Sequence, residues 1–250
     1  MSNDSSYLKN LQLNSEYAKN YYLKSINKTY QQDFLERSVL PKLIPRDFKP
    51  MKIADIACGG GTLTYHLSKI FPDAHYFLSD LNSDAIKIAR EINSCKKNIK
   101  FLTEDFYNTS IKSNYIDLTF CMQTLSWVQN PKKFLSKILE ITKNKGYFII
   151  SSLFNITHDV DIYCKIKDHT LKGNIFVNYN TFSKHTIKRW LKGKVEYFEI
   201  IPFEIKNDLK CDSRGLGSYT IKTINGERLT FSGGLLLNWG FLIGKKKDSL

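Results

Sequence analysis

The chain has few of the residues that mark secreted, metal-binding or membrane proteins. Its cysteines, at positions 58, 95, 121, 164 and 211, lie far apart, and none forms a Cys-x-x-Cys pair. This spacing gives no zinc pattern and favours reduced thiols over a disulfide framework. No run of about 18 apolar residues suggests a membrane span. The start, Met-Ser-Asn-Asp-Ser-Ser, lacks the basic and apolar regions of a signal peptide. We therefore expect a cytoplasmic protein with no metal site.

Acidic residues are also scarce relative to basic ones. Lysine and arginine number 37 against 24 aspartates and glutamates, which gives a net charge of +13. A basic excess indicates nucleic-acid binding when it is clustered on a recognisable module. Here the lysines are scattered among many asparagines and isoleucines, as in proteins encoded by AT-rich genomes. The densest group, residues 184–194, follows good capping residues at 180–183 and is typical of the solvated face of a helix. We expect no nucleic-acid partner.

Length and composition favour a single α/β domain. The chain has 250 residues, 42% of them hydrophobic and 24% charged, which is enough for a sheet covered on both faces. We treat residues 1–250 as one domain. Its parts are a helical N-terminal cap at 1–45, a core at 46–152, and a segment at 153–250 that holds the substrate side and the last strands.

A glycine-rich turn dominates the core. Residues 53–62 read Ile-Ala-Asp-Ile-Ala-Cys-Gly-Gly-Gly-Thr, between an apolar run at 51–56 and a helical pattern at 63–70. Glycines between a strand and a helix let the backbone approach a ligand, which parallel strands place at their carboxyl ends. A dinucleotide fingerprint would need a third glycine where Thr64 stands. The turn therefore disfavours nicotinamide and flavin dinucleotides.

Three further apolar runs end in polar residues. The run at 74–79 ends in Asp80, about 20 residues past the glycines, where nucleotide-binding α/β units place a ribose-binding acid. A carboxylate can accept hydrogen bonds from both ribose hydroxyls. The run at 99–102 leads into Thr-Glu-Asp-Phe at 103–106, and the run at 115–121 leads into Met-Gln-Thr-Leu-Ser-Trp-Val at 122–128. We expect these strand ends to gather at one edge of a sheet.

Together these motifs resemble those of class I S-adenosylmethionine-dependent methyltransferases over roughly residues 50–152. The resemblance implies a seven-stranded Rossmann-like fold, mostly parallel with an antiparallel last strand. It also implies S-adenosylmethionine as cofactor and S-adenosylhomocysteine as product. Ala57 stands where many members have glycine, and Ser126 where many have histidine or glutamine. The cofactor-binding residues that the resemblance implies are Asp55, Ala57, Cys58, Gly59, Gly61, Asp80, Leu81, Asp105, Phe106 and Gln123.

The first 45 residues are helical in pattern and rich in aromatics, and Pro41 and Pro45 are expected to break the helix before the first strand. In small-molecule methyltransferases that resemble this chain, such a helix forms a lid over the cofactor. One of Tyr17, Tyr21 and Tyr22 would then contact the methionine carboxylate or the substrate. Alternatively, these tyrosines only pack the helix on the core.

Beyond Gly146, the run at 147–154 predicts a fifth strand, which is followed by Asn155, His158 and Asp159 at the carboxyl edge. His158 is the candidate general base, needed only if the acceptor carries a proton that must leave. The alternative is that His158 is a loop histidine without a catalytic role. His66 and His75 are set aside because of their places on a helix and at the wrong end of a strand. The residues expected to bind substrate are Tyr17, Tyr21, Tyr22, Ser126, Trp127 and Asn155.

The C-terminal part is predicted to form strands. Residues 195–205 and 235–244 are expected to pair antiparallel. Between them, residues 218–231 alternate polar and apolar side chains about Asn225-Gly226, a strong hairpin signal. This hairpin, inserted before the last strand, would cover the active site or form a dimer edge.

These observations predict methyl transfer to an oxygen or nitrogen of a small molecule by a monomer or homodimer. The lysine-rich surroundings favour an anionic metabolite. One alternative is an RNA or tRNA methyltransferase, although Cys121-Met122-Gln123-Thr124 lacks the Asn/Asp-Pro-Pro-aromatic pattern of amino-group DNA enzymes. Cys121 also lacks the prolines that flank the cysteine of cytosine-C5 enzymes. The other alternative is a non-catalytic cofactor-binding subunit.

Overall fold

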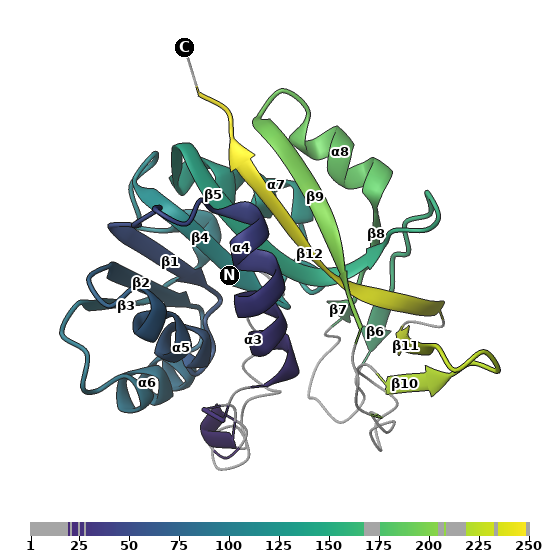
Figure 1. Ribbon diagram of the computed structural model, residues 1–250, viewed down its shortest axis with the longest axis horizontal. Coiled ribbons are helices and arrows are strands. Elements are labelled where there is room, and N and C mark those ends of the chain that lie inside the picture. The colour runs from purple at the N-terminus through teal and green to yellow at the C-terminus, as the bar shows by residue number, and fades with distance from the viewer. Residues whose placement is uncertain are drawn as a thin grey trace.

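A twisted, mostly parallel sheet organises the computed structural model (Figure 1). The structure describes residues 20, 22–24, 26–27, 29–167, 176–204, 208, 219–232 and 235–248. Strands β3, β2, β1, β4 and β5 lie side by side in that order and run parallel. They span Ile99–Thr103, His75–Asp80, Lys52–Ile56, Ile116–Met122 and Thr142–Asn155.

The last strand, β12 (Leu235–Lys246), is antiparallel and lies between β5 and β9 (Val195–Phe203). Its first residues also pair with the hairpin of β10 (Tyr219–Lys222) and β11 (Arg228–Ser232). The expected antiparallel pairing and the hairpin about Asn225-Gly226 are therefore confirmed. With β8 (Phe182–Ser183), which pairs with β5, the described sheet has 10 strands rather than the seven expected.

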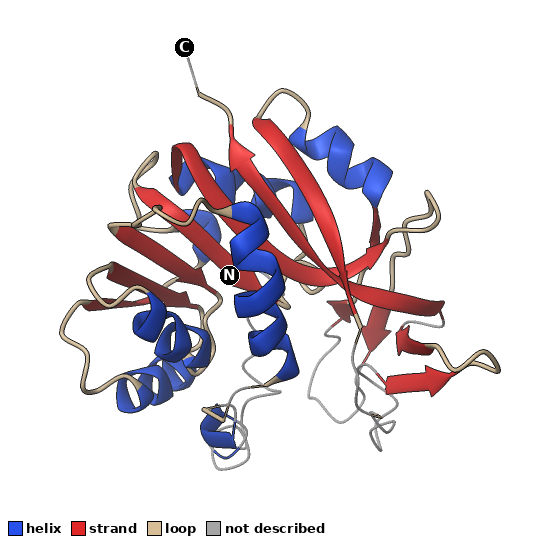
Figure 2. Cartoon of the chain, viewed as in Figure 1, coloured by secondary structure: helices blue, strands red, loops and turns tan. Residues whose placement is uncertain are grey.

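Helices cover both faces of the sheet (Figure 2). One hydrophobic cluster joins the sheet to α7 (Pro131–Ile141) and α8 (Lys184–Leu191). The other joins its opposite face to α4 (Leu40–Leu43), α5 (Thr62–Ile70) and α6 (Ser83–Ile92). β5 supplies both clusters, because successive side chains of a strand point to opposite faces: Phe148 and Ile150 face one way, Tyr147 and Ile149 the other.

The basic helix forms where the sequence predicts it. Ser183 caps α8 by accepting a hydrogen bond of 3.2 Å from the backbone N–H of Thr186. Asp161 supports the same end, since its Oδ1 accepts from the backbone N–H of Ser183 at 2.7 Å. A small separate hairpin, β6 (Lys165–Lys167) with β7 (Phe176–Asn178), was not foreseen.

The expected helix break at Pro41 is wrong. The N-terminal helix runs through α3 (Tyr30–Phe34), a π-helical turn over Leu35–Val39, and α4, which ends at Leu43. The π turn resets the hydrogen-bond pattern, so Pro41 falls in the first turn of α4, where a missing N–H costs least. Figure 1 shows this helix crossing in front of the sheet.

The expected start of the fifth strand is also wrong. β5 begins at Thr142, and Gly146 lies within it. The pairing of β4 with β5 shifts register between Ile116 and Leu118. A Cβ on Gly146 would lie 2.9 Å from the carbonyl oxygen of Lys143, so glycine permits a close backbone approach there. Within the described residues, no helix is long and apolar enough to cross a membrane.

Candidate functional site

The turn after β1 has an unusual backbone. Ala57, Gly59 and Gly61 have φ angles of 56°, 52° and 69°, in the left-handed region. Glycine adopts this conformation freely, whereas for alanine it costs roughly 1–2 kcal/mol. The turn still forms with Ala57, and it is held from β2 because the backbone N–H of Cys58 donates to the Ser79 carbonyl at 3.1 Å.

Asp80, at the end of β2, fastens the same turn. Its Oδ2 accepts a hydrogen bond of 2.9 Å from the backbone N–H of Gly59, and its Oδ1 accepts one of 2.8 Å from the N–H of Asn82. Burial raises the pKa of Asp80, and the backbone hydrogen bonds partly oppose this shift. Each carboxylate oxygen has two lone pairs, so both can still accept a hydrogen bond from a ligand hydroxyl.

Asp55 lies at the end of β1, beneath the turn. Its side chain is 2% exposed, and its Oδ2 accepts a hydrogen bond of 3.0 Å from Thr64 Oγ1. Its pKa is raised to about 7: burial is the largest cause, the Thr64 hydrogen bonds oppose it, and the charge of Asp80 adds to it. A carboxylic acid that ionises near neutral pH responds strongly to any positive charge brought beside it.

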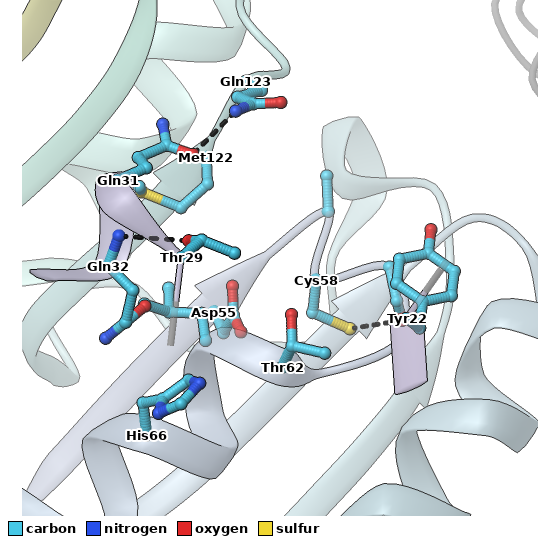
Figure 3. Close-up of a pocket in the computed structure, with 13 residues that line it drawn as sticks. Tyr22, Thr29, Gln31, Gln32, Asp55, Cys58, Thr62, His66, Met122 and Gln123 are labelled. Carbon is cyan, nitrogen blue, oxygen red and sulfur yellow. Dashed lines mark hydrogen bonds between the residues drawn. The ribbon is translucent and has the colours of Figure 1, made fainter. Parts of the chain in front are cut away.

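Asp55 opens into a cavity of about 240 Å³ (Figure 3). Three parts of the chain line it: the turn with the start of α5, the end of β4, and the N-terminal segment. Among the residues that the structure describes, none of those lining it is a lysine or arginine. They are Tyr22, Thr29, Gln31, Gln32, Asp55, Ala57, Cys58, Gly59, Thr62, Leu63, His66, Met122 and Gln123.

Tyr22 lies directly against the glycines. A Cβ built on Gly59 would come within 2.7 Å of the Tyr22 hydroxyl oxygen, and one built on Gly60 would overlap the tyrosine ring. Any larger residue at position 59 or 60 would collide with Tyr22, so these two glycines are needed for the close approach of the Tyr22 side chain. Tyr22 is the one N-terminal tyrosine candidate within the described residues; Tyr17 and Tyr21 lie outside them.

The N-terminal helix is bonded to the strand ends through Gln31. Gln31 Nε2 donates to Ser151 Oγ on β5 at 3.0 Å, and Gln31 Oε1 accepts from Gln123 Nε2 at 2.7 Å. Gln123 follows β4 and has a φ of 58°, so two non-glycine residues in the left-handed region, Ala57 and Gln123, line the cavity. Such backbone strain persists where the surrounding structure holds it, often at functional sites.

Comparison with known proteins identifies the family. A family model described as a methyltransferase domain matches residues 47–198, more than half of the chain and all the strand ends described above. This chain belongs to the class I S-adenosylmethionine-dependent methyltransferases.

A relative and two solved structures give the degree of likeness. The chain is 24% identical over 190 residues to malonyl-[acyl-carrier protein] O-methyltransferase 2 of Ilyobacter polytropus, an alignment that covers 74% of this chain and 71% of the relative. A putative methyltransferase, solved in complex with the Haloferax volcanii Trm112 methyltransferase activator, has a TM-score of 0.64 at 13% identity and covers 94% of this chain and 95% of its own. A third protein, 1,6-didemethyltoxoflavin-N1-methyltransferase of Burkholderia thailandensis, was solved with bound 1,6-didemethyltoxoflavin and S-adenosylhomocysteine. It has a TM-score of 0.55 at 13% identity, with coverage of 93% of this chain and 90% of its own. At these identities the solved structures show the fold alone.

The structure brings about half of the sequence-predicted cofactor residues of this methyltransferase to the cavity. Asp55, Ala57, Cys58, Gly59 and Gln123 line it. Gly61 and Asp80 do not line the cavity: Gly61 is the N-cap residue of α5, and Asp80 accepts a hydrogen bond from the backbone N–H of Gly59. Leu81, Asp105 and Phe106 follow β2 and β3 at the same sheet edge and do not line this cavity.

The acid and aromatic after β3 have partners within the protein. Asp105 Oδ1 accepts a hydrogen bond of 3.0 Å from the backbone N–H of Tyr107 and begins a short 3-10 helix, Phe106–Asn108. The Phe106 ring is 7% exposed and packs edge-on against Phe134 of α7, 5.0 Å away. The ring therefore faces the core in this structure, and the cofactor-binding role that the resemblance implies for Phe106 stays a prediction.

Tyr22 is the predicted substrate residue that lines the cavity within the described residues, whereas Ser126, Trp127 and Asn155 lie near the ends of β4 and β5, outside the lining. Ser126 Oγ and Ser152 Oγ form a buried hydrogen bond of 2.7 Å, and the Trp127 ring lies 4.4 Å from that of Tyr179. Asn155 accepts a hydrogen bond of 3.1 Å from the backbone N–H of His158. These residues form an ordered region beside the cavity, and their contact with a substrate stays a prediction.

The histidines differ from expectation. His158 is exposed and is not among the residues that line the cavity, whereas His66, set aside from the sequence, is 7% exposed and lines it. His66 lies one turn beyond Thr62 on the face of α5 that the glycine turn directs toward the ligand side. That spacing from the glycines is the signal by which the sequence could have revealed it.

The cysteines at the site are poor nucleophiles. Burial raises the pKa of the Cys58 thiol well above its ordinary value, and the charges of Asp55 and Asp80 add to the effect. Burial raises the pKa of Cys121, which is 0% exposed, to about 12. Since the thiolate is the reactive form, neither residue suits the covalent chemistry of a cytosine-C5 enzyme.

Proposed function

We propose that this methyltransferase transfers the methyl group of S-adenosylmethionine to an oxygen of a small anionic molecule. One observation carries the proposal: the cavity joins a buried acid, Asp55, to the strained ends of β1 and β4 at Ala57 and Gln123. In the fold of this family, the carboxyl ends of these strands are where the cofactor binds.

The residues present fit the cofactor. Asp55 is a buried acid whose pKa is raised to about 7, and within the described part of the chain no lysine or arginine lines the cavity to neutralise it. A positively charged cofactor would supply that charge. Asp80 offers lone pairs to ribose hydroxyls, while the backbone of the turn allows close approach. When bound, the cofactor supplies a methyl group on an already activated sulfonium.

The main task of this chain is then to orient the acceptor relative to the methyl group of the cofactor. The reaction is an in-line displacement, and holding the acceptor atom about 3 Å from the methyl supplies much of the rate enhancement. The N-terminal wall, with Gln31, Gln32 and Thr29, would exclude water and offer neutral donors to the acceptor. Its polar but uncharged side chains suit an anion that is stabilised by the positive charge of the cofactor.

A carboxylate oxygen is the acceptor that the site supports best. A carboxylate is ionised at neutral pH and has no proton to lose, so its methylation needs no general base. His158 lies outside the cavity lining, and His66, which lines the cavity, is not needed as a base for such an acceptor. The name of the Ilyobacter relative, an O-methyltransferase of a malonyl group, points to the same acceptor chemistry.

The test is transfer of labelled methyl from S-adenosylmethionine to a panel of carboxylic acids, acyl thioesters with a free carboxylate, and bulk tRNA. We expect label in a carboxylate-containing acceptor, released by mild alkali because methyl esters hydrolyse whereas N-methyl groups do not. The Asp80→Ala variant serves as a control deficient in cofactor binding. Alkali-stable label in a small molecule would indicate transfer to nitrogen or to a hydroxyl oxygen and would overturn the carboxylate acceptor, and label in tRNA would replace the proposal with the nucleic-acid alternative.

A further inference from the structure

The side chain of Gln31 connects three distant parts of the chain. Gln31 is in the first turn of α3, and its carboxamide reaches Ser151 at 120 residues' separation and Gln123 at 92. One amide group thus contacts β5 through its nitrogen and the residue after β4 through its oxygen. Figure 3 shows the Gln31 and Gln123 side chains meeting at the edge of the cavity.

Ser151, on β5, accepts hydrogen bonds from both glutamines. Its hydroxyl oxygen accepts from Gln31 Nε2 at 3.0 Å and from the backbone N–H of Gln123 at 3.1 Å. The carbonyl oxygen of Ser151 accepts from the same Gln123 N–H at 2.8 Å. Ser151 is 1% exposed, so these bonds are protected from water at one end. Gln123 is therefore fixed at both its backbone and its side chain, in a left-handed conformation that costs energy to maintain.

The hydrogen bonds of Gln31 to Ser151 and Gln123 form a bridge between the N-terminal segment and the sheet. Its position matters because this segment forms one wall of the cavity. Tyr22, Thr29, Gln31 and Gln32 form the N-terminal wall of the cavity, opposite the glycine turn. The far end of the same helix is attached to β9 in another way, through an ion pair of 2.5 Å between Lys42 Nζ and Glu199 Oε1. The Tyr197 hydroxyl of β9 also donates to the carbonyl oxygen of Leu43 at 3.4 Å, so the helix has polar attachments both at the cavity and remote from it.

We propose that Gln31 is a positioning residue of the cofactor site. It fixes the Gln123 carboxamide and presses the N-terminal wall against the ends of β4 and β5, so that the cavity is complete only while the bridge is formed. This inference rests on the proposed function, since it assumes that the cofactor occupies this cavity. Gln31 acts through Gln123 and the wall, and no contact of its own with the reacting atoms is required.

The test measures S-adenosylhomocysteine binding by titration calorimetry in the wild type, Gln31→Leu and Lys42→Ala. Leucine has a similar volume and cannot form either hydrogen bond. We expect Gln31→Leu to bind about tenfold more weakly, the effect of about one net hydrogen bond. Lys42→Ala loosens the helix at its remote end and should stay within about twofold of the wild type.

Two further measurements separate positioning from general destabilisation. In the wild type, S-adenosylhomocysteine should slow amide hydrogen exchange over residues 30–34, and in Gln31→Leu it should not, although both proteins are folded. Gln123→Leu removes the same side-chain bond from its other partner, so the double variant Gln31→Leu/Gln123→Leu should lose less than the sum of the two single losses.

The outcomes are distinguishable. If the wild type fails to bind S-adenosylhomocysteine, the proposed function itself is wrong. If the wild type binds and Gln31→Leu binds equally well, the positioning role alone is overturned. Equal weakening in Gln31→Leu and Lys42→Ala would also overturn it, because loosening the helix anywhere would then suffice. Should Gln31→Leu not fold, Gln123→Leu measured in the same way decides the matter.

Discussion

Thr64 Oγ1 donates a hydrogen bond of 3.0 Å to Asp55 Oδ2, and both side chains are buried. The bond joins the first turn of α5 to the last part of β1, across the glycine turn. Thr64 stands where a dinucleotide-binding turn would need its third glycine. Thr64, whose presence disfavours NAD binding, thus has a structural role of its own: its hydrogen bond orients the buried carboxyl group of Asp55.

We expect Asp55 to make the folded protein less stable as pH rises from about 4 to about 7. In the unfolded chain this acid ionises near pH 4, whereas burial holds its pKa at about 7 in the fold. Between these values the folded state binds more protons, so raising the pH favours unfolding, by up to about 4 kcal/mol. In urea titrations, Asp55→Asn should therefore gain stability relative to the wild type across this range. A difference between the two proteins that stays constant with pH would contradict the assignment.

Cofactor affinity should depend on pH through the same residue. A cofactor that brings positive charge to the cavity favours the ionised form of Asp55, so affinity should rise as pH increases through 7 and then level off. Calorimetry with S-adenosylmethionine between pH 6 and pH 8.5 would measure this. Asp55→Asn should bind more weakly and lose the dependence. A slope that persists in the variant would assign the titration to another group.

Asp80→Ala should weaken S-adenosylmethionine binding by about tenfold to a hundredfold. Charge-assisted hydrogen bonds are worth about 1.5–3 kcal/mol, and the variant also releases the N–H of Gly59. Asp117 is a matched control, since its Oδ2 accepts from the backbone N–H groups of Met51 and Lys52 at the opposite end of β1. Asp117→Ala should lower stability and leave affinity unchanged. Unaltered affinity in Asp80→Ala would remove the ribose assignment.

His158→Ala should change turnover by no more than about twofold if the acceptor is a carboxylate. The side chain is exposed and lies outside the cavity lining, and a carboxylate needs no base. The measurement is kcat with a saturating acceptor, together with its pH profile. A loss of about a hundredfold with cofactor affinity intact would instead support His158 as general base, as the sequence suggests.

Ala57→Gly should stabilise the protein by about 0.5–1 kcal/mol. The φ of 56° costs alanine energy that glycine does not incur, and the greater freedom of glycine in the unfolded chain offsets only part of this gain. Lys145→Gly tests the same effect away from the cavity, because Lys145 has a φ of 61°. Denaturant midpoints would measure both. Destabilisation of Ala57→Gly alone would show that its methyl group packs usefully in the turn.

The sequence predicted the elements whose signals are local. The glycine turn, the Ser183 cap and the Asn225-Gly226 hairpin each depend on residues adjacent in the chain, and the structure confirms them. In each case backbone chemistry within a few residues decides the conformation. The mostly parallel sheet, in contrast, was implied by the resemblance to the methyltransferase family, and the structure confirms it.

What the sequence could not predict depends on distant contacts. Gln31 resembles any polar residue of an amphipathic helix until Ser151 and Gln123 are placed beside it. The position of His66 on a helix argues in the sequence against a role at the site. The glycine turn before this helix, however, determines which of its faces points to the cavity. The expected helix break at Pro41 is wrong because of the π-helical turn before it, which has no clear sequence signal.

The position of β12 has a consequence for how the chain folds during synthesis. β12 pairs with β5 over Asn238–Lys245 on one side and with β9 over much of its length on the other. Until a ribosome has released residues 235–246, β5 and β9 have no strand between them, and the hydrogen-bonding edges that β12 later joins lack a partner. The core strands β1 to β5 can pair earlier, because their partners precede them or follow closely. We therefore expect emergence of β12 to be the step that commits a nascent chain to the native sheet, and premature termination before residue 235 to yield aggregation-prone products.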